Sequence, residues 1–112
     1  AVTAACMMTK KSLFYRLHGL DDRFQVAFND IDYCLRMRQL GKLVVYQAYA
    51  ELYHYESLTR GDDKNAENKK RFSAEVKLFK KRWGEILKKG DPYYNPNLSL
   101  ARSDCSLRKK NE

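Results

Sequence analysis

Apolar side chains recur at helical spacing in two stretches of this chain. The longer stretch, residues 69–90, reads "KKRFSAEVKLFKKRWGEILKKG" and carries apolar residues at alternating intervals of four and three positions. These residues are Phe72, Val76, Phe79, Trp83 and Ile86. Because these intervals place side chains on one face of an α-helix, the stretch predicts a long amphipathic helix with a basic opposite face. Gly90 and Pro92 are expected to end it.

The shorter helical stretch lies within "FNDIDYCLRMRQLG", residues 28–41. Ile31, Cys34, Leu35 and Met37 have helical spacing there, and Gly41 stands where a left-handed cap is expected. The stretch therefore predicts a helix that begins among acidic residues and ends at a glycine.

Other apolar stretches are more typical of strands. Residues 1–8 are small and apolar and predict a buried strand, followed by a short helix between a Thr9 cap and Gly19. Residues 43–55, "LVVYQAYAELYHY", are rich in β-formers and alternate from Ala48 onward. We therefore expect an α+β fold, with short strands, packing helices and the long C-terminal helix lying on the sheet.

Length and composition favour one folded domain. The chain has 112 residues, of which 44% are hydrophobic, 12% aromatic and 32% charged. The net charge of +8 would suit nucleic acid, phosphorylated ligands or an anionic membrane surface. Three cysteines without Cys-x-x-Cys spacing indicate neither a disulfide framework nor a cysteine zinc site. With no spanning segment or signal peptide, a cytoplasmic location is the simplest expectation.

Asp30 and Asp32 stand at the start of the shorter predicted helix. A carboxylate at a loop-to-helix junction can face a cleft and act as a general base, because the helix fixes its backbone. Capping the helix and complementing its dipole would also account for two acids at this position. The residues alone favour the capping interpretation and leave the catalytic one open.

His54 and the loop after it are a second candidate site. Alternation places His54 on the same side as Ala48, Ala50 and Leu52, where it would be a structural histidine, a general acid or a metal ligand. Glu51 points to the opposite side, so no second ligand is near in sequence. The loop from Ser57 to Gly61 contains hydroxyls and Arg60, which suit either a phosphate contact or an ordinary turn.

The order of these stretches resembles the second half of the catalytic domain of family-2 glycosyltransferases of the GT-A fold. The resemblance is to bacterial enzymes that build cell-surface polysaccharides. Its most specific part is "FNDIDYCLRMRQLGKLVVYQAYAELYHYESLTRG", residues 28–61, with an acidic motif, helix, strand and histidine loop in order. In "VTAACMMTKKSLFYRLHGLDDRF", residues 2–24, His18 and Leu20 replace the first glycine and the phenylalanine of a Gly-Gly-Phe-Asp-Glu type turn. Residues 71–100 are similar to the segment that closes such domains.

The resemblance implies roles for individual residues. Asp30 matches the catalytic base, with Asn29 in place of the more common glutamate. Asn29, Asp32 and Arg36 are implied as residues that contact or orient the acceptor, and Asp32 would alternatively orient Arg36. His54 matches a histidine that approaches the divalent metal and the diphosphate. Ser57 and Arg60 are implied as diphosphate contacts.

The implied activity is transfer of a sugar from a nucleotide-sugar donor to a saccharide acceptor, inverting and dependent on Mg²⁺ or Mn²⁺. No Asp-x-Asp motif precedes "NDID", so the nucleotide-binding half is expected to lie outside these residues. Residues 1–100 would be the acceptor-side part of the domain, and residues 101–112 a partly disordered tail. Such a fragment is expected to be inactive alone, to expose apolar surface and to self-associate. Its parent protein would lie in the cytoplasm, at the inner face of the membrane.

Two other classes of function remain open from the residues. A basic nucleic-acid-binding module would use lysines of the long helix such as Lys69, Lys77 and Lys80, and would be indifferent to Asp30. A protein-interaction module would dock through the apolar stripe from Phe72 to Ile86. Acidic residues beside the expected cleft disfavour nucleic acid, and the resemblance disfavours both alternatives.

Overall fold

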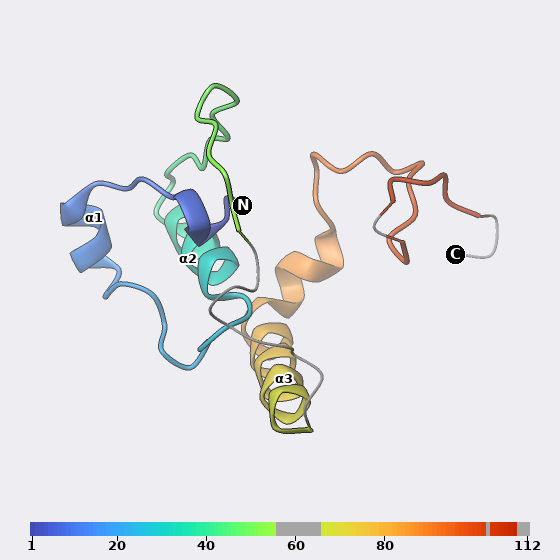
Figure 1. The fold of residues 1–112 in the computed structure, drawn as a ribbon, viewed down its shortest axis with the longest axis horizontal. Coiled ribbons are helices and arrows are strands. Elements are labelled where there is room, and N and C mark those ends of the chain that lie inside the picture. Colours follow the sequence, from blue (N-terminus) through green and yellow to red (C-terminus); the bar gives the residue numbers. More distant parts are fainter. Residues whose placement is uncertain (56–65, 103, 110–112) are drawn as a thin grey trace. The chain divides into compact units, whose positions relative to one another are not determined.

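A computed structural model describes residues 1–55, 66–102 and 104–109. Its elements in chain order are the 3₁₀ helix η1 (Ala4–Cys6) and the α-helices α1 (Lys11–Arg16), α2 (Asn29–Gln39) and α3 (Ala66–Lys89) (Figure 1). The chain divides into two units, Ala1–Arg82 and Trp83–Glu112, and α3 contributes residues to both. The candidate site lies entirely in the first unit.

Both of the strongly periodic stretches form the predicted helices. In α2, Tyr33 and Cys34 are buried, and Gly41 adopts the left-handed φ of +68° expected of a cap. The amide of Lys42 donates to the carbonyl of Met37, which satisfies a carbonyl at the end of the helix. Residues 66–89 form α3, and Gly90 follows it with a φ of +72°. The spacing of apolar residues therefore predicted these two helices, and the glycines predicted where they end.

The apolar face of α3 packs on aromatic side chains rather than on a sheet. Within the first unit, the ring of Phe79 contacts Phe24 at a centroid distance of 6.1 Å and Phe28 at 4.8 Å. Phe24 and Phe79 are buried. The loop before α2 thus supplies the surface that the helix needs, and the prediction that α3 covers a sheet was wrong for the described residues.

The predicted α+β class with short strands is not supported either. Residues 4–6 form an exposed 3₁₀ turn rather than a buried strand, and residues 43–55 have no regular structure. The β pairing within the described ranges is one isolated antiparallel bridge, between Leu98 and Leu107. A strand needs a neighbour for its amide and carbonyl groups, so β-forming composition alone cannot produce one.

The short helix α1 forms close to its predicted position but with a different start. Thr9 does not cap it: its hydroxyl bonds the Tyr33 hydroxyl at 3.2 Å, and Lys10 is the N-cap. Gly19 follows with a φ of +70°, and its amide donates to the carbonyl of Phe14. The predicted stop at Gly19 is therefore confirmed.

The second unit contains a small turn structure after α3. Ser99 is buried, and its carbonyl accepts a hydrogen bond from the Tyr94 hydroxyl at 2.9 Å. The amide of Ser99 donates to Ser106 at 2.9 Å, beside the bridge between residues 98 and 107. Partial disorder of residues 101–112 stays a prediction, and residues 103 and 110–112 lie outside the description.

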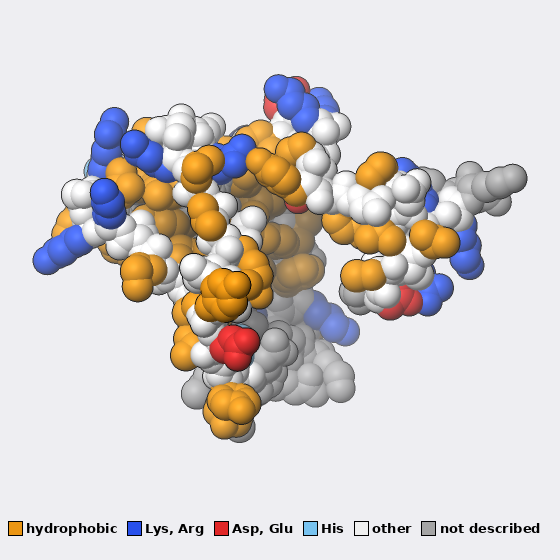
Figure 2. Space-filling view, turned by 90° about the horizontal axis from the view of Figure 1, so that it is seen from above, with side chains coloured by type: hydrophobic (Ala, Val, Ile, Leu, Met, Phe, Trp, Pro, Cys, Tyr) orange, Lys and Arg blue, Asp and Glu red, His pale blue; other side chains and the backbone are white. Residues whose placement is uncertain are grey.

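Many apolar side chains of the described residues are exposed, and Figure 2 shows hydrophobic side chains on the surface that it draws. Between residues 43 and 55, Tyr49 and Tyr53 are each more than nine-tenths exposed. Across the described ranges, no helix is long and apolar enough to cross a membrane.

Candidate functional site

Asp30 lies in the first turn of α2, one residue inside the helix rather than at its cap. The N-cap is Phe28, and Asn29 is the first helical residue. Asp30 is half-buried; its Oδ1 accepts a hydrogen bond from the amide of Ile31 at 2.8 Å, and its Oδ2 accepts one from Ala4 at 3.2 Å. A carboxylate has about four acceptor positions, so both oxygens retain capacity for a further partner.

The residue before α2 has an unusual backbone conformation. Phe28 has a φ of +66°, in the left-handed region that side chains other than glycine rarely adopt. Its ring stacks against Phe79 at 4.8 Å and against Phe72 at 5.8 Å, with interplanar angles of 24° and 26°. Aromatic packing onto α3 therefore holds a turn whose backbone is costly. This turn sets the direction in which the first turn of α2 leaves the loop.

Glu75 of α3 fixes the same loop through its carboxylate. Its Oε1 accepts hydrogen bonds from the amides of Gln25 at 2.9 Å and Val26 at 3.2 Å, and its Oε2 accepts one from Ala27 at 3.0 Å. Only 3% of Glu75 is exposed. Hydrogen bonds from several amides stabilise a buried carboxylate and leave none of these three donors unsatisfied. The loop is thus bound to α3 by both polar and aromatic contacts.

A groove runs between this loop and the first half of α3, with a volume of about 490 Å³. The loop and first turn of α2 contribute one wall, and α3 contributes the other. The lining residues are Val26, Ala27, Phe28, Asp30, Asn68, Lys69, Arg71, Phe72 and Glu75. The volume falls in the range of about 300–1,000 Å³ that is usual for small-molecule sites. Asp30 is thus one of the residues that line a groove of this size.

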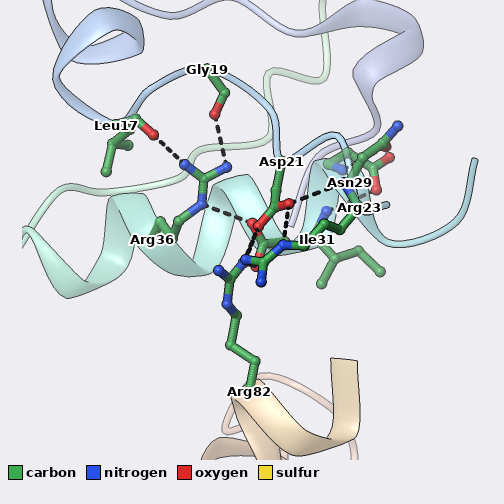
Figure 3. Close-up of polar contacts among 10 residues, drawn as sticks. Leu17, Gly19, Asp21, Arg23, Asn29, Ile31, Arg36 and Arg82 are labelled. Atoms are coloured by element: carbon green, nitrogen blue, oxygen red, sulfur yellow. Dashed lines mark hydrogen bonds and ion pairs between the residues drawn. The ribbon is translucent and has the colours of Figure 1, made fainter. Parts of the chain in front are cut away.

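Asp32 is entirely buried and takes part in ion pairs instead of facing this groove. Its Oδ2 accepts from Nε of Arg36 at 2.8 Å, and its Oδ1 accepts from Nη1 of Arg82 at 2.7 Å. Arg36 also donates to the carbonyls of Leu17 and Gly19 (Figure 3). The Arg36 side chain thus links the middle of α2 to the end of α1. Orientation of Arg36 by Asp32 has a direct geometric basis, whereas a role toward the acceptor stays a prediction.

Asp21 extends this network to the loop after α1. Arg82 reaches from α3 and donates to Asp21 Oδ2 at 2.7 Å, as Figure 3 shows. The guanidinium of Arg23 adds two hydrogen bonds, at 2.9 and 2.7 Å. These bonds from Arg23, opposed by burial and helped by Arg82, hold the pKa of Asp21 well below its ordinary value of 3.8. Arg82 consequently bridges two carboxylates.

Of the other predicted site residues, His54 is described and does not line the groove. His54 lies on the exposed stretch after α2, while Ser57 and Arg60 lie outside the described residues. Within the described ranges, no three His, Cys, Asp or Glu residues converge on a metal position. These residues by themselves do not supply the donor set that Mg²⁺ or Mn²⁺ requires.

Sequence reasoning missed Glu75 and Arg82, although the pattern held a signal for both. Glu75 follows Phe72 by three positions, and Arg82 follows Phe79 by three. Each therefore lies on or beside the apolar stripe rather than on the basic face of α3. A charged residue on a buried stripe needs a partner, because an unpaired buried charge is costly. That need predicts a contact, but the pattern does not identify the partner.

Three relatives resemble the chain. The uncharacterized protein y4gI of Sinorhizobium fredii is 46% identical over 108 residues, which cover 96% of the chain and 12% of that protein. The O-antigen biosynthesis protein RfbC of Myxococcus xanthus is 39% identical over 113 positions, covering all of the chain and 8% of RfbC. The N-acetylglucosaminyl-diphospho-decaprenol L-rhamnosyltransferase of Mycobacterium tuberculosis is 29% identical over 62 residues, 55% of the chain and 20% of that enzyme.

The chain therefore spans about a tenth of the length of the first two relatives. No family model matches it, and no solved structure matches it significantly. The names of RfbC and of the rhamnosyltransferase point to a glycosyltransferase-related family connected with polysaccharide synthesis.

Proposed function

We propose that these residues form the acceptor-side part of a GT-A-type glycosyltransferase that builds a cell-surface polysaccharide. The observation that carries the proposal is the position of Asp30 at the mouth of α2 and in the wall of a groove large enough for a sugar. Similarity along the whole chain to RfbC, which is named for O-antigen biosynthesis, supports a role in polysaccharide synthesis. Similarity over 62 residues to a rhamnosyltransferase supports sugar transfer.

In the proposed reaction, Asp30 removes the proton from an acceptor hydroxyl while that oxygen attacks the anomeric carbon of the donor sugar. The new glycosidic bond forms as the bond to the nucleoside diphosphate breaks, which inverts the anomeric configuration. General-base catalysis of this kind requires a carboxylate within hydrogen-bonding reach of the hydroxyl. Asp30 suits this role because each of its oxygens accepts one backbone hydrogen bond and retains capacity for another.

The donor and the metal would depend on other parts of the protein. The implied Mg²⁺ or Mn²⁺ would take most of its ligands from outside the described residues, with His54 as one additional ligand. Ser57 and Arg60 remain candidates for contacts to the diphosphate. In this proposal the groove supplies the base, while donor binding needs other parts of the protein. The isolated chain is therefore expected to release no nucleoside diphosphate.

The proposal is tested with the full-length protein that carries these residues. It is incubated with a panel of nucleotide sugars, Mn²⁺ and candidate saccharide acceptors, and the masses of the products are measured by mass spectrometry. The expected result is an acceptor heavier by one sugar residue, with one nucleoside diphosphate released for each transfer. If no donor in a panel of common hexose, deoxyhexose and N-acetylhexosamine nucleotides gave a heavier acceptor, the proposed function would be contradicted.

A further inference from the structure

The groove beside Asp30 is lined by charged, polar and aromatic side chains. Some of these side chains already bind other groups of the protein. Glu75 accepts three backbone hydrogen bonds, so its carboxylate serves the loop. Phe28 is stacked between Phe72 and Phe79. Phe72, in contrast, is 51% exposed although it lines the same groove. Part of its ring is therefore available to a ligand.

The formal charges of the residues that line the groove cancel. Two carboxylates, Asp30 and Glu75, and two cations, Lys69 and Arg71, are among the lining residues. A diphosphate would favour a site with an excess of cations and would be repelled by Asp30. A neutral ligand with many hydroxyl groups meets no such repulsion, and it can both donate to a carboxylate and accept from an ammonium group.

An exposed aromatic ring adds a preference for a flat apolar surface. The face of a phenylalanine ring carries negative charge density, so it attracts the weakly positive C–H groups of a pyranose ring. The hydroxyls at the edge of that pyranose then remain free to reach polar groups nearby. Phe72, Asp30 and the exposed Lys69 offer this combination in one groove.

We propose that this groove is the binding site for the acceptor saccharide, with one sugar ring lying on Phe72, a hydroxyl directed to Asp30 and Lys69 donating at the rim. The proposal rests on the proposed function and extends it, because it assigns the groove to the neutral acceptor rather than to the nucleotide-sugar donor. Phe72 and Lys69 are then residues that position the acceptor, while Asp30 meets the reacting oxygen.

The groove is prepared for this role by contacts that do not involve a ligand. The loop wall is held by Glu75, and Phe28 is held between two rings of α3. A wall fixed in advance lowers the ordering cost of binding. The acceptor hydroxyl would thus meet Asp30 at a defined position.

The test compares Phe72→Leu, which removes the aromatic face but keeps apolar bulk, with Phe72→Tyr, which keeps the ring. Tyr49→Leu serves as the control, because Tyr49 is 93% exposed and does not line the groove. In the full-length protein we expect Phe72→Leu to raise the KM for the acceptor about tenfold, the upper end of an aromatic contact. The KM for the nucleotide sugar should stay unchanged, and Phe72→Tyr and Tyr49→Leu should resemble the wild type.

A second readout does not need turnover. Saturation-transfer NMR with methyl β-D-glucopyranoside and methyl α-L-rhamnopyranoside should show contact with the wild type and with Phe72→Tyr, and should lose it in Phe72→Leu. Lys69→Ala changes an exposed side chain. It should also raise the acceptor KM, which keeps the test decisive if Phe72→Leu fails to fold.

The outcomes separate the site from the function. Unchanged acceptor KM and glycoside contact in a folded Phe72→Leu enzyme would overturn the groove assignment and leave the transferase activity standing. A rise in the donor KM alone would also overturn it, because the groove would then hold the donor. Glycoside contact that depends on Phe72 in a protein that transfers no sugar would support the site and contradict the proposed function.

Discussion

At the scale of single residues, the two aspartates at the start of α2 have separate surroundings despite being two positions apart. Asp30 lines a groove, whereas Asp32 is fully buried and paired with Arg36 and Arg82. A buried carboxylate with two guanidinium partners is held in place and shielded from a substrate. Asp32 therefore has a structural role, in which it pairs with Arg36 and Arg82, and Asp30 stays the proposed base.

Asp21 provides a pH test of the same network. Because its pKa in the folded protein lies below 3.8, its contribution to stability is fully present above that pH and is lost as the pH falls through the lowered value. We expect Asp21→Asn to lower the free energy of unfolding at pH 7, and the difference from wild type to shrink toward pH 2. Urea unfolding at several pH values measures this. A difference that is as large at pH 2 as at pH 7 would contradict the ionic role of Asp21.

At the scale of elements, the central feature is the attachment of the loop before α2 to α3. Three amides meet one carboxylate, and two aromatic stacks hold Phe28 in its left-handed conformation. The helix α3 therefore determines where the first turn of α2 lies. The apolar face of α3 packs against Phe24 and Phe28 of the loop, and this packing forms the groove.

Glu75→Gln tests this attachment. The amide keeps one acceptor oxygen but turns an NH₂ group toward a backbone donor, so we expect a loss of about 2 kcal/mol in the free energy of unfolding. Hydrogen exchange of the Gln25, Val26 and Ala27 amides should accelerate more than exchange within α2. Glu85→Gln is the matched control on the same helix, because the Glu85 side chain is 83% exposed.

If both substitutions had the same small effect, Glu75 would not hold the loop. If Glu75→Gln were destabilising but exchange rose uniformly through α2, the carboxylate would support the fold in general rather than this loop in particular.

The sequence predicted the elements whose determinants are local. The α2 and α3 helices follow from periodicity within each stretch, and their ends follow from Gly41 and Gly90. The strands expected at residues 1–8 and 43–55 depended on partners elsewhere, which composition cannot supply.

The candidate site was predictable to a similar extent. Asp30 was identified from its place before a helix and from the family resemblance, and the structure puts it in a groove. Its surroundings come from residues about 40–50 positions away in sequence, above all Phe72 and Glu75. A single sequence shows that Glu75 needs a partner, but the partner is a set of backbone amides that leaves no trace in residue type.

At the scale of the whole molecule, several large apolar side chains between positions 43 and 55 are exposed. Leu43, Val45, Tyr46 and Leu52 are each at least 70% exposed. Apolar surface of this extent favours association. We expect the isolated chain to self-associate, with a sedimentation coefficient that rises with concentration. The combined substitution Val45→Asp and Leu52→Asp should reduce the effect, and a concentration-independent monomer would contradict the expectation.

The proposed function depends on Asp30 acting as the base of a sugar transfer. The most direct measurement compares the full-length protein with its Asp30→Asn and Asp22→Asn variants, recording nucleoside diphosphate release in the presence of acceptor. Asp22 is an exposed carboxylate in the loop before α2 and does not line the groove. Donor binding is measured in parallel to separate binding from chemistry.

We predict that Asp30→Asn lowers the turnover number by about 10²- to 10⁴-fold, the usual contribution of a general base, with donor affinity retained. Asp22→Asn should keep full activity. Unchanged turnover in Asp30→Asn would contradict the account and would leave Asp30 with its hydrogen bonds to Ile31 and Ala4 as its only role.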